Sequence, residues 1–195
     1  MRRLYHIIGG LFLVLMVSYI DKKRGLILIS SLFLVAIIID AIRLLLPDLN
    51  RIFFRWFGPL LRQEEEGRPT GTGYYLAGIL ISILLFKREI ALFSMTILAV
   101  GDPAASTIGK RWGQFRIGGK SLEGSIAFFI TSLGAGLILY GLWPALPIGI
   151  LITGAITGTL AELISNKLND NLIIPLATSG AMEVILFFLN LIYLN

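Results

Sequence analysis

Long runs of apolar residues dominate this sequence and constrain its fold more than any other feature. Seven such runs stand along the chain, and they are Leu4–Ile20, Gly25–Leu46, Tyr74–Phe86, Ile90–Val100, Leu122–Leu142, Leu146–Ile164 and Leu172–Leu194. A transmembrane helix needs about 20 consecutive apolar residues, and most of these runs approach that length. The pattern predicts an all-α, polytopic membrane helix bundle of about seven transmembrane helices, forming a single integral membrane domain over residues 1–195.

The composition argues against a soluble domain. The chain is 56% hydrophobic and only 15% charged, and its mean hydropathy is +0.84. Soluble domains carry about 25% charged residues, so this chain has too little charge to cover a soluble surface. No small-residue cleavage site ends the first run, so we expect it to be a helix of the mature protein. Cysteine is absent, which excludes disulfides and thiolate catalysis.

The fourth run, Ile90–Val100, is too short to cross a bilayer alone. It reaches the required length only if the helix continues through Gly101–Ser106, which contains Asp102 and Pro103. These two residues are tolerated at membrane depth only where they face protein or a wet cavity. An alternative with fewer crossings and a re-entrant segment therefore stays open.

Lysine and arginine are divided unevenly between the two sides of the predicted bundle. With the N-terminus inside, 12 of the 17 fall in inside segments and five in outside turns. The inside residues are Arg2, Arg3, Arg43, Arg51, Arg55, Arg62, Arg68, Lys110, Arg111, Arg116, Lys120 and Lys167. An excess of cations in cytoplasmic segments is the positive-inside pattern. We therefore expect the N-terminus to be cytoplasmic.

Most of the other polar residues fall at the same ends of the predicted helices. They are His6, Asp40, Arg43, Glu64–Glu66, Thr70, Asp102, Glu123, Glu162 and Asn169–Asn171. An ionisable group at membrane depth costs at least about 2.5–3.5 kcal/mol, so such groups usually mark ion pairs, cavities or functional sites. Their gathering on one face predicts a single polar site at the cytoplasmic surface.

Several of these residues also have simple structural interpretations. Asp40 and Arg43 are spaced i,i+3 on one helix face and can neutralise each other. His6 stands alone near the interface, where a packed or snorkelling histidine is as reasonable as a catalytic one. The Glu64–Glu66 run is typical of a solvated charge cluster. The Tyr74–Tyr75 pair fits an interfacial aromatic belt.

The segment Gly101–Gly113 combines residue types that suit a polyphosphate. Asp102 follows an apolar run among small residues, and Lys110 and Arg111 add two cations. The segment Lys120–Ser125 again brings together a cation, a hydroxyl and an acid. Small residues let a backbone approach a ligand closely, and a nearby acid suits the Mg²⁺ that accompanies a polyphosphate. The spacing is not that of a P-loop, and a basic loop that only sets topology is the alternative.

A last polar cluster follows the sixth apolar run. Glu162 lies inside the end of an apolar helix, and Asn169, Asp170 and Asn171 follow it across a short turn. These side chains offer oxygen ligands and amides that can read a base, although Asn and Asp are also ordinary turn residues. We keep both interpretations for this cluster.

Together these motifs resemble the CTP-dependent lipid-alcohol kinases, a family that comprises dolichol/polyprenol kinase, phytol kinase and the CTP-using diacylglycerol kinase. The resemblance covers most of the chain and rests on several motifs in the same order. They are Arg2–His6; Arg43–Pro47 with Asn50; Arg62, Glu65 or Glu66, and Thr70–Thr72; Gly101–Ala105; Gly109–Gly113; Lys120–Ser125; and Glu162, Asp170, Asn171 and Pro175. The resemblance implies CTP as phosphoryl donor, Mg²⁺ as cofactor and a membrane lipid alcohol as acceptor.

The resemblance also leads to predicted roles for individual residues. The predicted catalytic residues are Asp102, Glu123 and His6, and the predicted metal ligands are Asp102, Glu123 and Asp170. The predicted nucleotide-binding residues are Gly101, Asp102, Ala105, Gly109, Lys110, Arg111, Lys120, Ser121, Glu162, Asn169, Asp170 and Asn171. The lipid-acceptor side is predicted to hold Arg43, Glu65, Glu66 and Thr70.

We therefore predict phosphoryl transfer from CTP to a lipid hydroxyl in the bilayer. A polyprenol/dolichol-type isoprenoid is the first candidate acceptor, and diacylglycerol is an alternative. A lipid-phosphate cytidylyltransferase is the alternative enzyme because it needs the same ligands for CTP and Mg²⁺, but the motif of the known lipid cytidylyltransferases is not visible here. A transporter predicts polar residues through the midplane, which the one-sided clustering argues against. We expect no nucleic-acid partner, and the sequence makes no prediction about oligomers.

Overall fold

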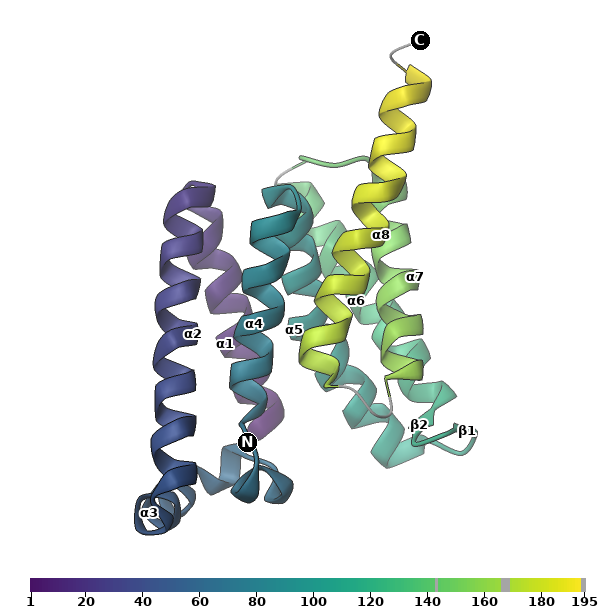
Figure 1. Cartoon of the computed structure of the whole chain (residues 1–195). Helices are drawn as coiled ribbons and strands as arrows, with labels where there is room; N and C mark the ends of the chain where they lie inside the picture. Colours follow the sequence, from purple (N-terminus) through teal and green to yellow (C-terminus); the bar gives the residue numbers. More distant parts are fainter. Residues whose placement is uncertain (143, 166–168, 194–195) are drawn as a thin grey trace.

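Seven apolar helices make up the bundle in the computed structural model, which describes residues 1–142, 144–165 and 169–193 (Figure 1). They are α1 (Arg2–Ser18), α2 (Lys22–Leu45), α4 (Gly71–Leu85), α5 (Arg88–Trp112), α6 (Leu122–Leu142), α7 (Ile148–Ile164) and α8 (Asp170–Tyr193). Each apolar run of the sequence corresponds to one of these helices, so the all-α class is confirmed. Lys167, which is predicted to lie inside, and Leu194, the predicted end of the last apolar run, lie outside the described residues.

The remaining elements are short and lie between the apolar helices. Helix α3 (Pro47–Phe57) and the 3₁₀ turns η1 (Gly58–Leu60) and η2 (Gln63–Gly67) join α2 to α4. Strands β1 (Arg116–Ile117) and β2 (Lys120–Ser121) form a small antiparallel hairpin between α5 and α6. Gly118 has a φ of 61° in the turn of this hairpin. Glycine adopts this left-handed conformation without steric cost.

Four of the helices are long and apolar enough to cross a membrane by length and composition. They are α2, α5, α6 and α8, while α4 and α7 are shorter apolar helices. These spans support an integral membrane protein, as the sequence predicts. The number of seven crossings stays a prediction.

Helix α5 is the centre of the bundle and packs against α1, α6, α7, α8 and α4. It continues through Asp102 and Pro103 to Trp112, as expected if this helix is to be long enough to cross a bilayer. Residues 101–112 are therefore helix rather than loop. Gly101 shows why small residues recur here. A Cβ atom at Gly101 would lie 2.6 Å from Ser132 Oγ and 2.7 Å from the Phe128 ring of α6. Only glycine therefore permits this close approach of α5 and α6.

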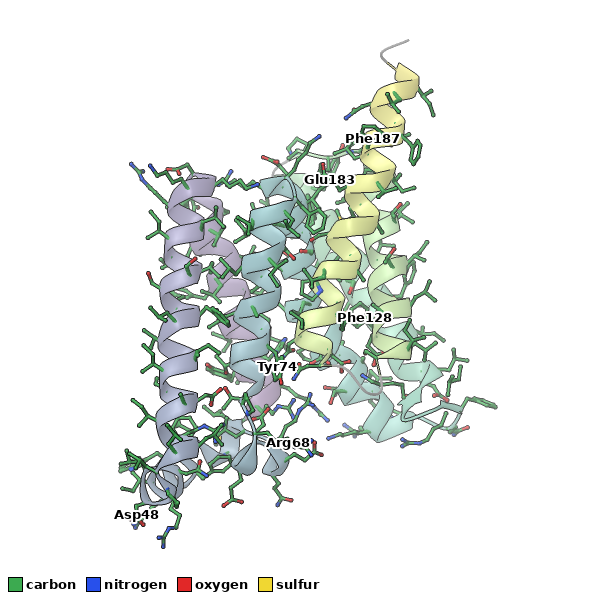
Figure 2. The ribbon with its side chains drawn as sticks, viewed as in Figure 1. Asp48, Arg68, Tyr74, Phe128, Glu183 and Phe187 are labelled. Atoms are coloured by element: carbon green, nitrogen blue, oxygen red, sulfur yellow. The ribbon has the colours of Figure 1, made fainter. Side chains whose placement is uncertain are left out.

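One end of the bundle holds the predicted inside residues. The helices alternate in direction, so the first turns of α1, α4, α6 and α8 lie at this end with α3 and the hairpin (Figure 1). We call it the polar end. Asp48 and Arg68 lie there, whereas Glu183 and Phe187 lie toward the opposite end (Figure 2). The grouping of inside residues agrees with the predicted topology, and their cytoplasmic orientation stays a prediction.

Labelling of single cysteines tests this orientation without background because the chain has no native cysteine. We expect Gln114→Cys, exposed at the polar end, to react in opened cells or inverted vesicles but not from outside intact cells. Lys23→Cys, exposed in the first turn of α2, should show the reverse pattern and serves as the matched control. External labelling of Gln114→Cys would reject the cytoplasmic assignment.

Candidate active site

Arg43 is buried near the last turn of α2 and connects this helix to the segment that follows. Its side chain is 2% exposed, and Nε donates to Asp40 Oδ1 at 2.7 Å. Its Nη atoms donate to Asn50 Oδ1 at 3.0 Å and to the carbonyl oxygens of Glu65 and Arg68 at 2.9 and 2.5 Å. A buried guanidinium is stable only when its charge and N–H groups find such partners. The predicted pairing of Asp40 with Arg43 is confirmed.

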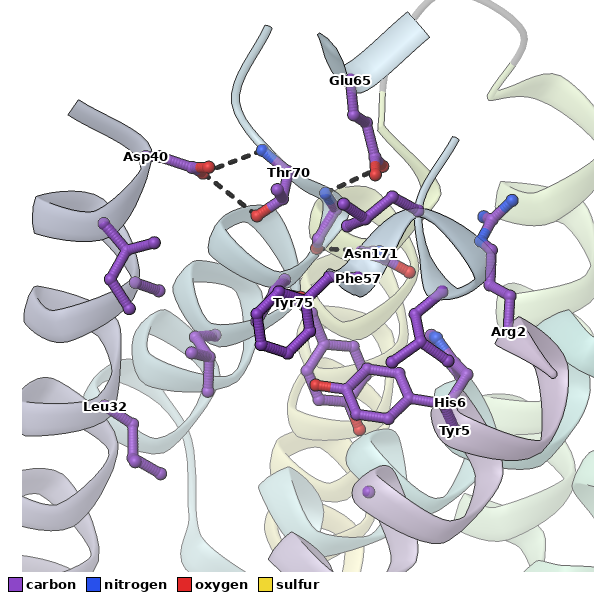
Figure 3. A pocket seen from close by; sticks show the side chains of 18 of the residues that line it. Arg2, Tyr5, His6, Leu32, Asp40, Phe57, Glu65, Thr70, Tyr75 and Asn171 are labelled. Carbon is purple, nitrogen blue, oxygen red and sulfur yellow. Dashed lines mark hydrogen bonds between the residues drawn. The ribbon is translucent and has the colours of Figure 1, made fainter. Parts of the chain in front are cut away.

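Two buried carboxylates hold the start of α4 beside Arg43. Asp40 Oδ2 accepts hydrogen bonds from the N–H and the hydroxyl of Thr70, at 2.8 and 3.0 Å (Figure 3). Glu65 Oε1 accepts from the N–H of Gly71 at 3.0 Å, and its Oε2 accepts from the N–H of Arg62 at 3.0 Å. Negative charge is favourable at a helix N-terminus, where N–H groups lack helical partners.

The three consecutive glutamates differ sharply in environment. Glu65 is 8% exposed, whereas Glu64 and Glu66 are exposed to solvent. Only the backbone carbonyl of Glu66 joins the network, where it accepts from Asn50 Nδ2 at 2.8 Å. The structure therefore brings Glu65, Thr70 and Arg43 together and leaves the Glu66 side chain outside.

An apolar groove of about 530 Å³ lies next to this network. We call it the α1–α2 groove, since those two helices supply about half of its lining, and α3, the segment after it and α4 supply most of the rest (Figure 3). Its apolar lining is Phe12, Leu13, Leu32, Val35, Ala36, Ile39, Phe53, Phe57, Leu60, Leu61 and Leu76. Its polar lining includes Arg2, His6, Asp40, Glu65, Thr70 and Asn171.

His6 and Tyr75 meet at the wall of this groove. Their ring centroids are 5.1 Å apart in an edge-to-face arrangement. His6 Nε2 and Tyr75 Oη are buried and have no hydrogen-bond partner in the described part of the chain. Among charged neighbours, Asp102 of α5 acts most strongly on His6, and it also acts on Arg2. His6 and Asp102, each predicted as a catalytic residue, therefore influence each other across the α1–α5 contact, and their catalytic roles stay predictions.

Lys120 forms a second cluster with two acids from α7 and α8. Its Nζ lies 2.9 Å from Glu162 Oε1 and 2.8 Å from Asp170 Oδ2, and we call these three residues the charged cluster. Ser125 Oγ donates to Glu162 at 3.1 Å, and Ser165 Oγ donates to Asp170. Burial by itself lowers the pKa of Lys120, but the two carboxylates outweigh it and raise that pKa above its usual value. Lys120 therefore stays charged.

The first turn of α8 joins the charged cluster to the groove. Asp170 belongs to the cluster, while the next residue, Asn171, lines the groove and donates from Nδ2 to the carbonyl of Gly71 at 3.0 Å. Asn169 Oδ1 in turn accepts from the N–H of Asn171 at 3.1 Å. The motif Asn169–Asn171 thus contributes to both the charged cluster and the α1–α2 groove.

The predicted nucleotide residues of α5 divide into packed and exposed groups. Gly101, Ala105 and Gly109 lie in the contact with α6, where a Cβ at Gly109 would be 2.7 Å from Ser121 Oγ. Lys110 and Arg111, in the last turn of α5, are exposed. The glycines thus shape the helix contact, and the two cations are open to solvent.

The three predicted metal ligands are not gathered at one point. Within the described ranges no three His, Cys, Asp or Glu side chains are grouped to hold a metal. Both oxygens of Asp170 accept hydrogen bonds from side chains, those of Lys120 and Ser165, and its role as a metal ligand stays a prediction. Glu123 uses Oε1 to accept from two backbone N–H groups but keeps Oε2 buried without a partner there. Since Mg²⁺ usually binds one or two carboxylates plus phosphates, Asp102 and Glu123 remain compatible with it.

Tyr75 lines the α1–α2 groove, a position that the sequence did not predict. Its position after the glycine-rich start of α4 fits an interfacial aromatic as well as a buried one. The spacing of residues along α4 does not indicate which helix covers the Tyr75 hydroxyl. Only the packing of α1 against this face brings Tyr75 to His6.

Comparison with known proteins identifies the family. The chain is 31% identical over 163 residues to CTP-dependent diacylglycerol kinase 1 of Schizosaccharomyces pombe, covering 75% of this chain and 74% of that protein. It is 31% identical over 162 residues to a protein named probable phytol kinase 1 of Oryza sativa, covering 69% and 52%. It is 31% identical over 184 residues to dolichol kinase of Saccharomyces cerevisiae, covering 89% and 34%. No family model and no solved structure matches the chain.

These similarities and the polar end of a membrane bundle define the class of protein. The chain belongs to the family of CTP-dependent lipid kinases. Its kinase class and the use of CTP, both expected from the motifs, are confirmed at this level. The chain spans about three quarters of the fission yeast relative but only about half or less of the rice and budding yeast proteins.

The different environments of the glutamates predict different effects of the same substitution. Glu65→Gln removes the charge that accepts from Gly71 and Arg62, and hydrogen bonds to charged groups contribute about 1.5–3 kcal/mol. We expect a lower Tm in detergent and reduced CTP-dependent kinase activity. Glu64→Gln is the matched control and should change neither. A loss in Glu66→Gln equal to that in Glu65→Gln would contradict the assignment of Glu65.

Proposed function

We propose that this protein transfers the γ-phosphoryl group of CTP to the hydroxyl of a membrane lipid alcohol at its polar end. The observation that carries the proposal is the first turn of α8. Asp170 there belongs to the charged cluster, and Asn171 lines the apolar groove. The charged cluster, whose Lys120 we assign to the nucleotide phosphates, and the groove for an apolar acceptor therefore share one helix turn.

The nucleotide side offers three cations for the triphosphate. Lys110 and Arg111 are exposed at the end of α5, and Lys120 is held in position by Glu162 and Asp170. Phosphoryl transfer depends mainly on positioning and on neutralising the phosphate charge, which such a set of cations supplies. Asn171 already bonds to the backbone of α4, so we assign contact with cytosine to Asn169 rather than to both amides.

Asp102 is the residue that we propose as acceptor of the hydroxyl proton. It makes no hydrogen bond or ion pair within the part of the chain that the structure describes, and it acts on His6 beside the groove. The hydroxyl oxygen forms a bond to the γ-phosphorus, the bond from that phosphorus to the bridging oxygen breaks, and CDP leaves. The proton passes to the Asp102 carboxylate. Mg²⁺, bound by Asp102 or Glu123 with the phosphates, would neutralise charge on the transferred group.

Two acceptors remain as candidates. The isoprenoid alcohol predicted from the motifs is the first, because its hydroxyl is its only polar group and the polar groups of the groove are few. Diacylglycerol is the second, because the fission yeast relative is named a diacylglycerol kinase and is 31% identical over 75% of this chain. A panel of lipid alcohols, assayed with purified protein, would rank them by kcat/KM.

Neutralising Asp102 tests its place in the reaction. Loss of one group that stabilises transition-state charge typically costs about 2.7–4 kcal/mol, a factor of about 10²–10³ in rate. We expect Asp102→Asn to insert and fold normally but to lose kinase activity by that factor. Asp48→Asn is the matched control, since Asp48 is an exposed aspartate on α3 at the same end. Near-normal turnover of folded Asp102→Asn would remove this residue from the mechanism.

Labelled CTP separates the kinase from a lipid-phosphate cytidylyltransferase. A kinase releases CDP, whereas a cytidylyltransferase attaches CMP to a lipid phosphate and releases pyrophosphate. With an isoprenoid alcohol or diacylglycerol, we expect γ-labelled CTP to label the lipid and α-labelled CTP not to label it. Transfer of the α label into lipid, with the γ label recovered in pyrophosphate, would establish the alternative enzyme.

A further inference from the structure

We propose that the α1–α2 groove binds the hydrocarbon tail of the acceptor, which enters from the bilayer between these helices, and that Tyr75 and His6 bind its hydroxyl. This inference rests on the proposed function and extends it by assigning a site to the lipid. Neither Tyr75 nor the apolar residues of the groove belong to the motifs that carry the family resemblance.

The groove walls are suited to a chain that enters from the membrane. Phe12 of α1 and Val35 and Ile39 of α2 line the groove and are also largely exposed on the outside of the bundle. Helix α2 is long and apolar enough to cross a bilayer, so its exposed apolar residues face lipid when it spans one. The walls are thus continuous with a lipid-facing surface, and an apolar tail can leave the bilayer without crossing water.

The polar end of the groove points to a hydroxyl. Tyr75 is 8% exposed, and neither its Oη nor His6 Nε2 has a hydrogen-bond partner among the described residues. Burying a polar group without a partner is costly, so two such atoms at one place call for a ligand group that can both donate and accept. Gly10 reinforces this arrangement, because a Cβ there would lie 2.6 Å from Tyr75 Oη.

The hydrogen bonds of the polar lining favour a lipid alcohol over a charged lipid. Asp40 and Glu65 already accept hydrogen bonds from the backbone of Thr70 and Gly71. In the groove lining that the structure describes, the buried atoms without a partner are His6 Nε2 and Tyr75 Oη. Before transfer, a neutral hydroxyl can accept from Tyr75 and donate to an unprotonated His6 nitrogen. In the transfer step the same hydroxyl turns its proton from His6 to Asp102, the proposed proton acceptor, which acts on His6 from α5.

Filling the groove tests the tail site. Gly9 lines the groove, and a Cβ at this position meets no atom within 4 Å, so Gly9→Phe adds bulk without disturbing the helix packing. We expect the KM for a long-chain lipid alcohol to rise at least about tenfold, the factor that follows when two methylenes no longer fit. The KM for CTP should not change. Gly134→Phe on α6, where a Cβ also meets nothing within 4 Å, is the matched control and should behave as wild type.

Removing only the Tyr75 hydroxyl tests the head site. Because this hydroxyl has no hydrogen-bond partner among the residues that the structure describes, Tyr75→Phe should not lower the Tm. It should reduce kcat/KM for the alcohol by about 3- to 10-fold, the value of one neutral hydrogen bond, with the KM for CTP unchanged. A purely structural role of the hydroxyl would instead lower the Tm and leave the kinetics of the folded enzyme intact.

Photocrosslinking gives a readout that does not depend on turnover. An isoprenoid alcohol with a diazirine in its tail should label wild-type protein on groove residues such as Val35 and Ile39, and Gly9→Phe should lose that labelling. Labelling elsewhere, or an unchanged lipid KM in Gly9→Phe, would overturn the groove assignment even if the kinase assay succeeds. Labelling of the groove in a protein that transfers no phosphoryl group would instead reject the proposed reaction and keep the lipid site.

Discussion

The burial of Arg43 is the interaction on which the polar end of the α1–α2 groove depends. A guanidinium at 2% exposure must keep its charge partner and its hydrogen-bond acceptors. These partners come from Asp40 on the same helix and from backbone carbonyls after α3, with Phe53 and Phe54 stacked near the guanidinium at 5.4 and 5.7 Å. The arginine thereby fixes the path of a segment that has little regular structure. That path carries Glu65 to the first turn of α4 and sets the polar end of the groove.

The need of buried charges for partners also explains why the charged groups occupy one end of the bundle. Ionised groups within a bilayer are stable when they are paired or open to water. In the charged cluster, Lys120 lies between Glu162 and Asp170, so three partly buried charges become a network with a net charge of minus one. The hairpin between α5 and α6 carries Lys120 to that position. Such a network also leaves the nearby exposed cations, Lys110 and Arg111, without competition from these acids.

The sequence predicted the helices well because apolar runs are local signals, and each of the seven runs corresponds to a helix. It also predicted which residues share the polar end, because alternating helices place every second loop on one side. It did not distinguish Glu65 from its neighbours, because the burial of Glu65 depends on the hydrogen bond from Arg43 to its backbone carbonyl. It did not indicate that Asp170 pairs with Lys120, 50 residues away, because that contact depends on the packing of the hairpin against α8. Tyr75 carried no sequence signal, since its unsatisfied hydroxyl results from packing against α1.

Helix α5 finally explains how two chemically different substrates can meet in so small a protein. One face carries glycines that bring it against α6, so that Ser121 and the hairpin lie beside its last turns. Another face lies against α1, where Asp102 acts on His6 at the edge of the groove. Asp102 and the cations of α5 lie about two helical turns apart on the same helix, at roughly 1.5 Å per residue. A triphosphate that spans this distance along the helix end would therefore present its terminal phosphate near Asp102, on the side from which we expect the lipid hydroxyl to approach.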